Sequence, residues 1–345
     1  MNIVDYRTRR RATAAFAVLG FVAFAPHNAW AWGSTGHRMT GELAIRNLPT
    51  TLPEFVLGES VAIAVGELAR EPDRSKGSGD PHDRDLDPGH YVDVSDDGKI
   101  LEGPSLSALP AMREDYDTAL RAAGSDQYKA GYLPYSIIDG WQQLVKDFAY
   151  WRVDTAGEKF AKTDEARAWF RRDRVAREAL TIRDLGYWAH FVGDGSQPMH
   201  ASVHYDGWGN FPNPQGFTTA KGTHGHFEGA FIRTCVTEAD VQAATAPYQA
   251  NTHAIQDRTG SYLATTLSKV VPFYVLEKAH AFEGCTADGK AFAAERLAAA
   301  VDELRDLIVD AWTASDDAKI GYPATAVKDV EAGKVDVLAQ LQGED

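Results

Sequence analysis

The sequence predicts an all-α fold: a single, mostly helical domain whose long loops gather at one end. Three observations support this class. Apolar residues recur at three- and four-residue steps over several long stretches, as on the buried face of a helix. Strand-like alternation is weak throughout the chain. Two stretches rich in Gly, Pro and Asp, residues 71–90 and 201–223, interrupt the helical pattern and predict loops.

The clearest helix is expected over residues 294–312. Its apolar residues fall on one stripe: Leu297, Val301, Leu304, Ile308 and Trp312. Similar patterns cover residues 110–123, 140–153 and 165–194. Residues 90–94, HYVDV, precede the turn-forming SDDGK and predict one short extended segment. Because the pattern fades after Trp312, residues 316–345 are expected to form a loosely attached C-terminal tail.

The first 31 residues have the three parts of an export signal. A basic start, RTRRR, is followed by the 14 apolar residues 12–25 and by small residues at Ala29 and Ala31. An apolar run of this length is too short to cross a bilayer, which needs about 20 residues. We therefore expect cleavage after Ala31, a mature domain over 32–315 that begins at Trp32, and a secreted or periplasmic monomer without a stable membrane anchor.

The chain is acidic, with a formal net charge of −14 that becomes −17 when residues 1–31 are removed. Such a charge repels polyanions at long range. It therefore argues against nucleic-acid binding through a basic groove. A negatively charged substrate would need locally bound cations, which metal ions can supply.

The two cysteines, Cys235 and Cys285, both lie in the mature part of the chain. An oxidising compartment would allow them to form a disulfide bond, and the even count slightly favours pairing over two separate buried thiols. In either form they are expected to be structural rather than catalytic.

The histidines carry the chemistry of this sequence. In HFVGDGSQPMH, His190 and Asp194 are four residues apart at the end of a helical pattern, so they share one face and can bind one ion. His200 follows six residues after Asp194. A histidine–aspartate pair alone is usually a surface or capping interaction, but the joint spacing predicts metal binding.

Two further groups have ligand-like spacing. His224 and Glu228 repeat the four-residue step at an apparent helix start, with His226 as a competing choice. His90 follows an acidic loop whose candidate ligands are Asp73, Asp80, His82, Asp83, Asp85 and Asp87. Most of these loop residues are expected to form a solvated acidic surface.

These motifs, together with Trp32-x4-His37, resemble the zinc-dependent phospholipase C and single-strand nuclease superfamily, and more closely its nuclease branch, the mung bean nuclease type. They follow the order of that family over nearly 200 residues. The resemblance implies an all-α fold with three zinc ions at the bottom of a cleft. It also implies that the mature amino terminus is itself a zinc ligand.

Carried over to this sequence, the resemblance implies three zinc sites. Trp32, through its α-amino nitrogen and carbonyl oxygen, and His37 would hold the first zinc. The remaining ligands would be Asp73, His90 and His190 for the second zinc, Asp194 as a bridge between the first two, and His200, His224 and Glu228 for the third. Asp73, Asp194 and Lys76 would be the catalytic residues, with Lys76 near the phosphate.

The sequence departs from the nuclease pattern in places. The nucleases usually have Trp-Ala-Asp where this chain has LAREPDRSK, and Asp73 is chosen partly because Lys76 then falls three residues later. Glu228 and the stretch NPQGF are typical of the phospholipases. The short Trp32-x4-His37 spacing and the long loop before His224 favour the nucleases.

The resemblance implies an exported endonuclease that hydrolyses single-stranded DNA or RNA, or nucleotides, to 5′-phosphate products with a metal-bound hydroxide. Tyr91 would stack on a base and Asp93 would bind its edge. A phospholipase C-like hydrolase of phosphatidylcholine and a non-catalytic exported zinc-binding protein remain alternatives. Three aromatic residues of the long loop are expected either to form a cleft rim or to anchor the loop: Tyr205, Trp208 and Phe211.

Overall fold

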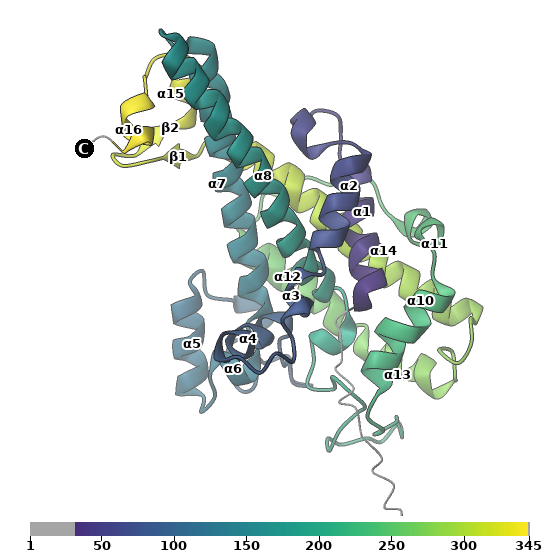
Figure 1. Cartoon of the computed structure of the whole chain (residues 1–345). Coiled ribbons are helices and arrows are strands. Elements are labelled where there is room, and N and C mark those ends of the chain that lie inside the picture. Colours follow the sequence, from purple (N-terminus) through teal and green to yellow (C-terminus); the bar gives the residue numbers. More distant parts are fainter. Residues whose placement is uncertain (1–31, 344–345) are drawn as a thin grey trace, which may run out of the picture.

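Two long antiparallel helices form the axis of the molecule, α7 (Leu133–Phe160) and α8 (Asp164–Asp194), as Figure 1 shows. The structure is a computed structural model that describes residues 32–343. The predicted export signal, residues 1–31, lies outside the described residues. The fold is all-α, as the sequence predicts, since the described chain contains only two strands of two residues each.

The ends of α8 follow from its sequence. Thr163 caps the N-terminus, where its side chain accepts a hydrogen bond from the Ala166 amide at 3.1 Å. Asp164 and Glu165 place negative charge in the first turn, which the helix dipole favours. The helix ends at Asp194, four residues before Pro198. Its C-terminal turn therefore delivers His190 and Asp194 together to the centre of the protein.

A third long helix, α14 (Ala287–Ser315), packs against this pair, and the predicted stripe is confirmed. Leu297, Val301, Leu304 and Ile308 are fully buried, and Trp312 is partly buried. Shorter helices surround the three long ones: α1 (Gly33–Arg46), α2 (Glu59–Leu68), α5 (Arg113–Ala122), α6 (Gln127–Ala130), α10 (Ile232–Cys235), α11 (Glu238–Ala244), α12 (Ile255–Leu267) and α13 (Val270–Lys278). Single turns lie at η1 (Glu54–Val56) and η3 (Leu106–Ala108).

The stretch 71–90, predicted to be a loop, folds into three short helical segments, so that prediction is wrong in part. They are α3 (Glu71–Arg74), α4 (Pro81–Leu86) and η2 (Asp87–His90). Each has a proline in its first turn, where the missing amide proton costs nothing and the fixed φ suits a helix. The prolines that suggested a loop therefore start helices. The extended segment predicted at 90–94 contains one isolated bridge, between Val94 and Ile100.

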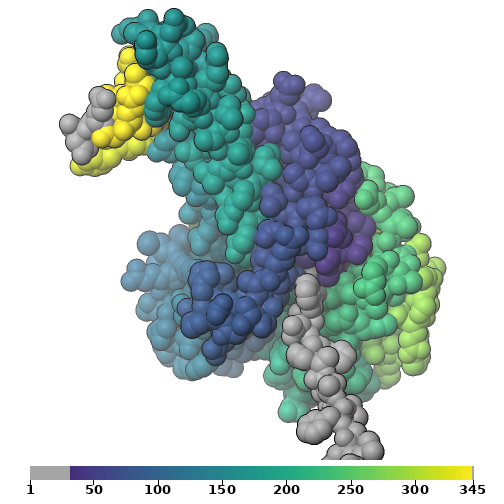
Figure 2. Space-filling model, in the orientation of Figure 1, coloured from purple at the N-terminus to yellow at the C-terminus, as the bar shows by residue number. Residues whose placement is uncertain are grey.

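The C-terminal segment, expected to be loosely attached, packs on the far ends of α7 and α8. It contains a hairpin of β1 (Lys319–Ile320) and β2 (Thr325–Ala326), then α15 (Val327–Glu331) and α16 (Leu338–Gln342). Its apolar side chains form a small separate core with the two long helices: Ile320, Val327, Val330 and Val337 against Ala149, Val153, Ala156 and Phe170. Figure 2 shows this part as an arm that projects from the body of the molecule.

Cys235 and Cys285 form a disulfide bond with their Cα atoms 5.1 Å apart, as the even count favoured. The bond ties the end of α10 to the segment just before α14 and closes a separation of 50 residues. Over the described residues, every helix is too short or too polar to cross a bilayer.

Candidate metal centre

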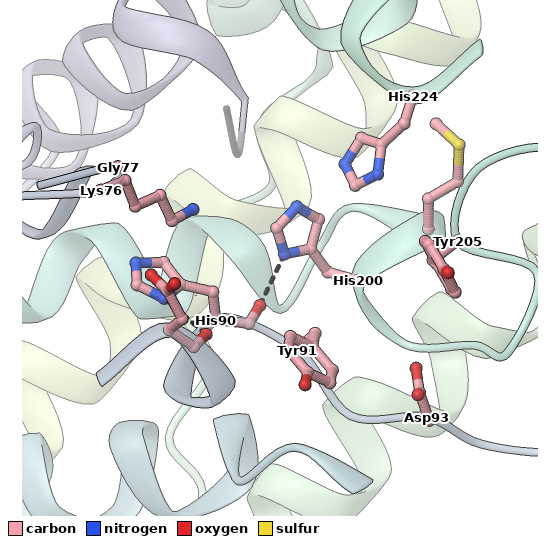
Figure 3. Close-up of a pocket in the computed structure, with 10 residues that line it drawn as sticks. Lys76, Gly77, His90, Tyr91, Asp93, His200, Tyr205 and His224 are labelled. Carbon is pink, nitrogen blue, oxygen red and sulfur yellow. Dashed lines mark hydrogen bonds between the residues drawn. The ribbon is translucent and has the colours of Figure 1, made fainter. Parts of the chain in front are cut away.

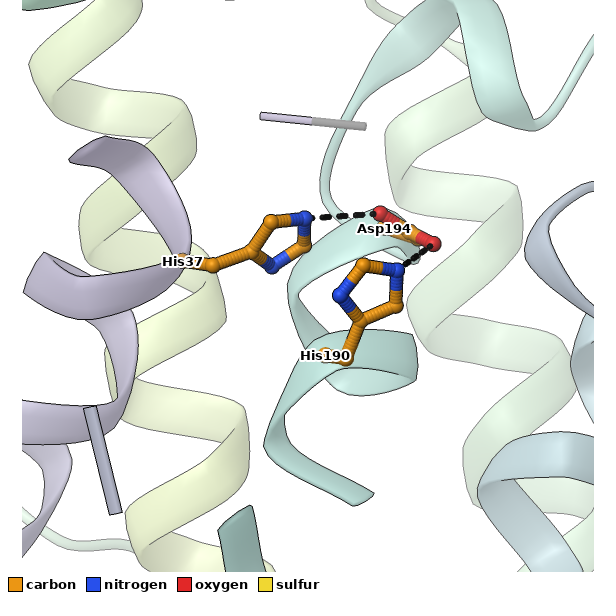
Figure 4. Close-up of side chains that lie close together, drawn as sticks. All are labelled: His37, His190 and Asp194. Atoms are coloured by element: carbon orange, nitrogen blue, oxygen red, sulfur yellow. Dashed lines mark ion pairs between the residues drawn. The ribbon is translucent and has the colours of Figure 1, made fainter. Parts of the chain in front are cut away.

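Asp194 lies between two histidines at the end of α8 (Figure 4). Its Oδ1 is 3.5 Å from Nε2 of His37, which comes from α1, and its Oδ2 is 3.3 Å from Nε2 of His190. All three side chains are fully buried. Gly193 permits this approach, because a Cβ there would come 3.1 Å from the ring of His37. The geometry brings three candidate ligands, two imidazoles and one carboxylate, around one point.

A second group shares His190 with the first. Asp73, from α3, has its Oδ1 3.7 Å from Nε2 of His190 and 3.9 Å from Nε2 of His90, which ends η2. Of the acidic residues in the 71–87 stretch, Asp73 is the one that the structure brings to these histidines. The short helices α3 and η2 therefore have a clear role, since they aim Asp73 and His90 at the end of α8.

A third group combines His200, His224 and Glu228. His200 belongs to η4 (Pro198–His200), and His224 lies in α9 (Thr223–Gly225). The Oε2 of Glu228 is 2.7 Å from Nε2 of His224 and 3.7 Å from Nε2 of His200. Glu228 lies in η5 (His226–Phe231), which is a π-helix. Such a widened turn is rare and often marks a functional site.

Most of the atoms that face one another in these groups lack hydrogen-bond partners of acceptable geometry, although Oε2 of Glu228 accepts from Gln197 and Oδ1 of Asp73 lies beside the Lys76 ammonium. The atoms without such a partner are both ring nitrogens of His37, Nε2 of His90, His190, His200 and His224, both carboxylate oxygens of Asp194 and Oε1 of Glu228. Buried polar atoms are rarely left without a partner, because each such atom costs about 1–3 kcal/mol. Bound cations would satisfy those that face another ligand, which leaves Nδ1 of His37 aside, and nitrogen with carboxylate oxygen is the donor set that zinc accepts. The residues fit the metal that the sequence implies.

Backbone carbonyl groups fix the orientation of three of the rings. Nδ1 of His190 is 2.8 Å from the Ala69 carbonyl, Nδ1 of His90 is 2.9 Å from the Asp87 carbonyl, and Nδ1 of His200 is 2.5 Å from the His90 carbonyl. A carbonyl oxygen only accepts, so Nδ1 carries the proton in each ring. Nε2 is then the free lone pair, which is the arrangement found in metal-binding histidines.

Burial sets the protonation of the histidines. It lowers the pKa of His37, His90 and His190 well below the ordinary value, and it also lowers the pKa of His200. These rings are therefore neutral near neutral pH, as a metal ligand must be.

The pKa values of Glu228 and Asp194 shift in opposite directions. Burial opposes the charge of Glu228, but His224 and His200 outweigh it and lower its pKa to about 2. Burial raises the pKa of Asp194 well above the ordinary value, although Lys76 acts against the shift. A buried carboxylate of this kind requires a cation to be charged at neutral pH. Lys76 lies 2.8 Å from Asp73, and Asp73 and Asp194 raise its pKa against the effect of burial.

Trp32 begins the described chain beside the first group. Its indole nitrogen donates to the Gly193 carbonyl at 2.7 Å and to Ser196 Oγ at 3.0 Å, and its ring is fully buried. These bonds fix Trp32 next to the turn that follows Asp194. The Trp32 carbonyl accepts a hydrogen bond from the Gly36 amide at 3.1 Å, and its second lone pair remains for another partner.

A cavity of about 630 Å³ opens above the second and third groups. Figure 3 shows His90, His200 and His224 in its wall, with Lys76 extending toward His200. The other lining residues are Gly77, Asp87, Tyr91, Asp93, Met199 and Tyr205. The predicted substrate-binding residues, Tyr91 and Asp93, are thus in the same cavity as the candidate metal ligands.

The aromatic residues of the 201–223 loop divide between the two roles considered for them. Trp208 is an anchor: it is 4 % exposed, and its indole nitrogen donates to the Pro212 carbonyl at 2.9 Å. Tyr205 lines the cavity and is 50 % exposed. Phe211 is 42 % exposed on the same loop. Tyr205 and Phe211 are therefore available as a rim.

Several candidate residues are not brought into the three groups. Nε2 of His226 is 3.0 Å from the Phe282 carbonyl, so this ring has a partner elsewhere. Among the residues of the acidic loop, Asp80, His82 and Asp85 are exposed and Asp83 is buried outside the groups, while Asp87 lines the cavity. For Asp80, His82 and Asp85, the expected solvated surface agrees with the structure.

Some contributors were not apparent in the sequence. Gln197 donates from Nε2 to Glu228 Oε2 at 3.1 Å and accepts from the Met199 amide at 2.6 Å, so it holds Glu228 and the turn before His200 at once. Ser196 accepts from Trp32. Asp96 and His204 form an ion pair beside the cavity wall. The only hint of Gln197 was its place inside the histidine motif.

No model of a known protein family matches the chain, and no curated protein matches its sequence. Among solved structures, the chain is similar to a crystal structure of the alpha-toxin of Clostridium perfringens, isolated from avian strain SWCP. The match has a TM-score of 0.34 and 14 % sequence identity over 89 % of this chain. The chain spans 66 % of the toxin chain, just under two thirds of its length. A similarity of this size is too low to support a conclusion about family or activity.

Proposed function

We propose that the chain is an exported zinc-dependent hydrolase of phosphoric diesters, related to the zinc phospholipases C and single-strand nucleases. The observation that carries the proposal is the meeting of three histidine–carboxylate groups at one cavity, with most of their facing atoms lacking hydrogen-bond partners. Each group supplies three side chains. A structural zinc is usually closed by four protein ligands, so groups of three favour a catalytic centre over a storage or structural role.

When bound, zinc ions would supply a nucleophile from water near neutral pH and neutralise the phosphoryl oxygens. The protein's own residues prepare the site for that chemistry. The buried histidines stay neutral and present Nε2, and each oxygen of Asp194 faces a histidine, of which His190 also belongs to the second group. The ammonium of Lys76 pairs with Asp73 and lines the cavity, where it could attract the phosphate of a substrate.

A phospholipid such as phosphatidylcholine is one substrate class. Its zwitterionic head group is not repelled by the acidic chain, whose net charge of −14 opposes the approach of a polyanion. The loop beside the cavity also exposes Tyr205 and Phe211. Aromatic side chains are favourable at a membrane–water interface, because one end is apolar and the other is wet. The acidic net charge and the exposed aromatic residues of the loop therefore favour a phospholipid substrate.

Single-stranded nucleic acid is the second substrate class, and the cavity wall carries the observation that favours it. Tyr91 offers a ring for stacking, which contributes about 1–3 kcal/mol per base. Burial raises the pKa of Asp93 to about 7. A carboxyl that is partly protonated at neutral pH can donate as well as accept, which suits the edge of a base.

The test uses protein whose chain begins at Trp32, purified with zinc. It is incubated with single-stranded DNA, with single-stranded RNA and with phosphatidylcholine in mixed micelles, and the release of acid-soluble nucleotide or phosphocholine is measured. Hydrolysis that stops with a chelator and returns with zinc supports the proposal, and the substrate that is cleaved decides between the two classes. Zinc-loaded protein that hydrolyses none of them would leave the non-catalytic zinc-binding alternative.

A further inference from the structure

We propose that Tyr205 is a specificity-determining residue and that the ion pair between Asp96 and His204 positions it. The inference rests on the proposed phosphodiesterase function and deepens it. It names residues that recognise the substituent carried by the phosphate, rather than the phosphate itself.

Tyr205 is placed to meet that substituent. It lines the same cavity as Tyr91 and Asp93, and half of its side chain is exposed. In Figure 3, these three residues lie on one side of His200 and Lys76 lies on the other. A phosphate bound between Lys76 and the candidate metal groups would therefore direct its substituent toward Tyr91 and Tyr205.

The residue before Tyr205 is held on every side. His204 is 1 % exposed, and its ring stacks on Trp208 with the centroids 3.7 Å apart. Its backbone carbonyl accepts from the Tyr274 hydroxyl at 2.7 Å. Its Nδ1 is 2.9 Å from the Trp208 carbonyl, and its Nε2 is 2.8 Å from Asp96 Oδ1. A carbonyl oxygen accepts and does not donate, so Nδ1 of His204 is the donor to the Trp208 carbonyl.

The ion pair joins the two segments that make this wall of the cavity. The Val92 amide donates to the His200 carbonyl at 2.8 Å, and the Val203 amide donates to the Val94 carbonyl at 3.1 Å. Asp96 and His204 continue this pairing one step beyond the backbone bonds. The segment that carries Tyr91 and Asp93 is thereby tied to the base of the loop that carries Tyr205.

Loss of Asp96 would be felt locally. Asp96 is 61 % exposed, and exposed ion pairs contribute little to global stability. Nε2 of the buried His204, in contrast, would be left without a partner, which is unfavourable in the interior. Relief of that cost would shift His204 and, with it, the adjacent Tyr205. The predicted consequence is weaker substrate binding in a protein that remains folded.

The experiment first establishes whether the parent protein cleaves short-chain phosphatidylcholine or a single-stranded oligonucleotide. It then measures kcat and KM of each variant with the substrate that is cleaved. The variants are Tyr205→Ala, Tyr205→Phe, Asp96→Ala, Asp96→Asn and the double variant D96A/Y205A. Asp97→Ala is the matched control, since Asp97 is the next residue, is exposed and within residues 32–343 pairs only with Lys99. Thermal unfolding checks that each variant is folded. Because half of the Tyr205 side chain is exposed, its replacement should not prevent folding.

We expect Tyr205→Ala to raise KM roughly 5- to 100-fold with little change in kcat, as for the loss of a stacking partner. Tyr205→Phe should keep most of the binding. Asp96→Ala should raise KM, Asp96→Asn should restore it in part because the amide can still hydrogen-bond to His204, and Asp97→Ala should have no effect. Asp96→Ala should add nothing in the Tyr205→Ala background, because Asp96 acts through Tyr205.

Either of two results would overturn this inference and leave the proposed function standing. One is an unchanged KM in Tyr205→Ala, and the other is an Asp96→Ala effect of the same size with and without Tyr205. A parent protein that hydrolyses neither substrate would overturn the proposed function and this inference with it.

Discussion

His37 and His190 stack face to face, with ring centroids 3.9 Å apart and planes inclined by 17°, although they come from α1 and α8. Two charged imidazolium rings would repel each other at this distance in a buried site. The stacking therefore agrees with neutral rings, in which Nε2 is free to bind a cation. The two rings approach opposite oxygens of Asp194, so both oxygens of this buried carboxylate face a histidine.

Replacing Asp194 with Asn should abolish turnover and reduce the zinc content. An amide cannot supply the two anionic oxygens that face His37 and His190, and loss of even an indirect metal contact costs about 10- to 100-fold. Turnover and zinc per chain would be measured together. Asp164→Asn is the matched control, because Asp164 is on the same helix and is 93 % exposed. Full activity with full zinc in Asp194→Asn would refute the assignment.

The amino terminus should matter for metal content. If the α-amino group of Trp32 is a ligand, a protein that retains Ala31 has an amide nitrogen in its place and an incomplete first site. We expect it to bind about one zinc fewer than protein beginning at Trp32, and to be less active. Mass spectrometry would define each amino terminus. Equal zinc and equal activity in both forms would exclude Trp32 as a ligand.

The buried Asp154 on α7 should make stability depend on pH. Burial, with the charge of Asp173, raises its pKa to about 8 from an ordinary value of 3.8. Between these values the folded state holds a proton that the unfolded state has lost, so the free energy of unfolding falls as pH rises. Asp154→Asn lacks this dependence.

Urea denaturation at pH 5 and pH 8 would test this. Between pH 5 and pH 8, the unfolding free energy of the parent should fall by on the order of 3–4 kcal/mol more than that of Asp154→Asn. Asp164→Asn again serves as control, since it is exposed. A difference between Asp154→Asn and the parent that does not change with pH would contradict the raised pKa.

Removing the disulfide should destabilise the fold without disturbing the metal centre. A bond that closes a separation of 50 residues restricts the unfolded chain by about 4 kcal/mol. The double variant C235A/C285A should therefore unfold at lower urea concentration and keep its zinc. An unchanged unfolding midpoint would contradict this stabilisation.

The long helices could be predicted because their periodicity is strong: the stripe of α14 is buried where the pattern placed it. The short helices of residues 71–90 could not be predicted, because proline and glycine usually indicate a loop. In this chain Pro72 and Pro81 lie in the first turns of helices. The order of the C-terminal segment depends on contacts distant in sequence. Arg152 of α7 donates to Ser315 at 2.8 Å and pairs with Glu331 at 3.2 Å, and no local pattern reports such contacts.

Two pairs of candidate ligands, His190 with Asp194 and His224 with Glu228, are predicted by four-residue steps, which place side chains on one helical face, whereas His37 and Asp73 follow from the family resemblance. The structure brings these residues together in the three groups. The π-helix around Glu228 was not apparent, since its widened turn has no periodicity of its own. The ion pair of Asp96 and His204 was also missed, because its residues are far apart in sequence and neither belongs to a ligand motif. The sequence thus predicts the candidate ligands better than the contacts, such as Asp96 with His204, that join the segments of the cavity wall.

The most direct test of the central claim is the number of zinc ions per chain, measured by elemental analysis of protein that begins at Trp32. The three buried groups predict three zinc ions. They also predict the loss of the ion from the third site when His224 is replaced by Ala. A protein that is folded, has Trp32 at its amino terminus and holds no zinc after dialysis against the metal would contradict the proposed metal centre and the hydrolase built on it.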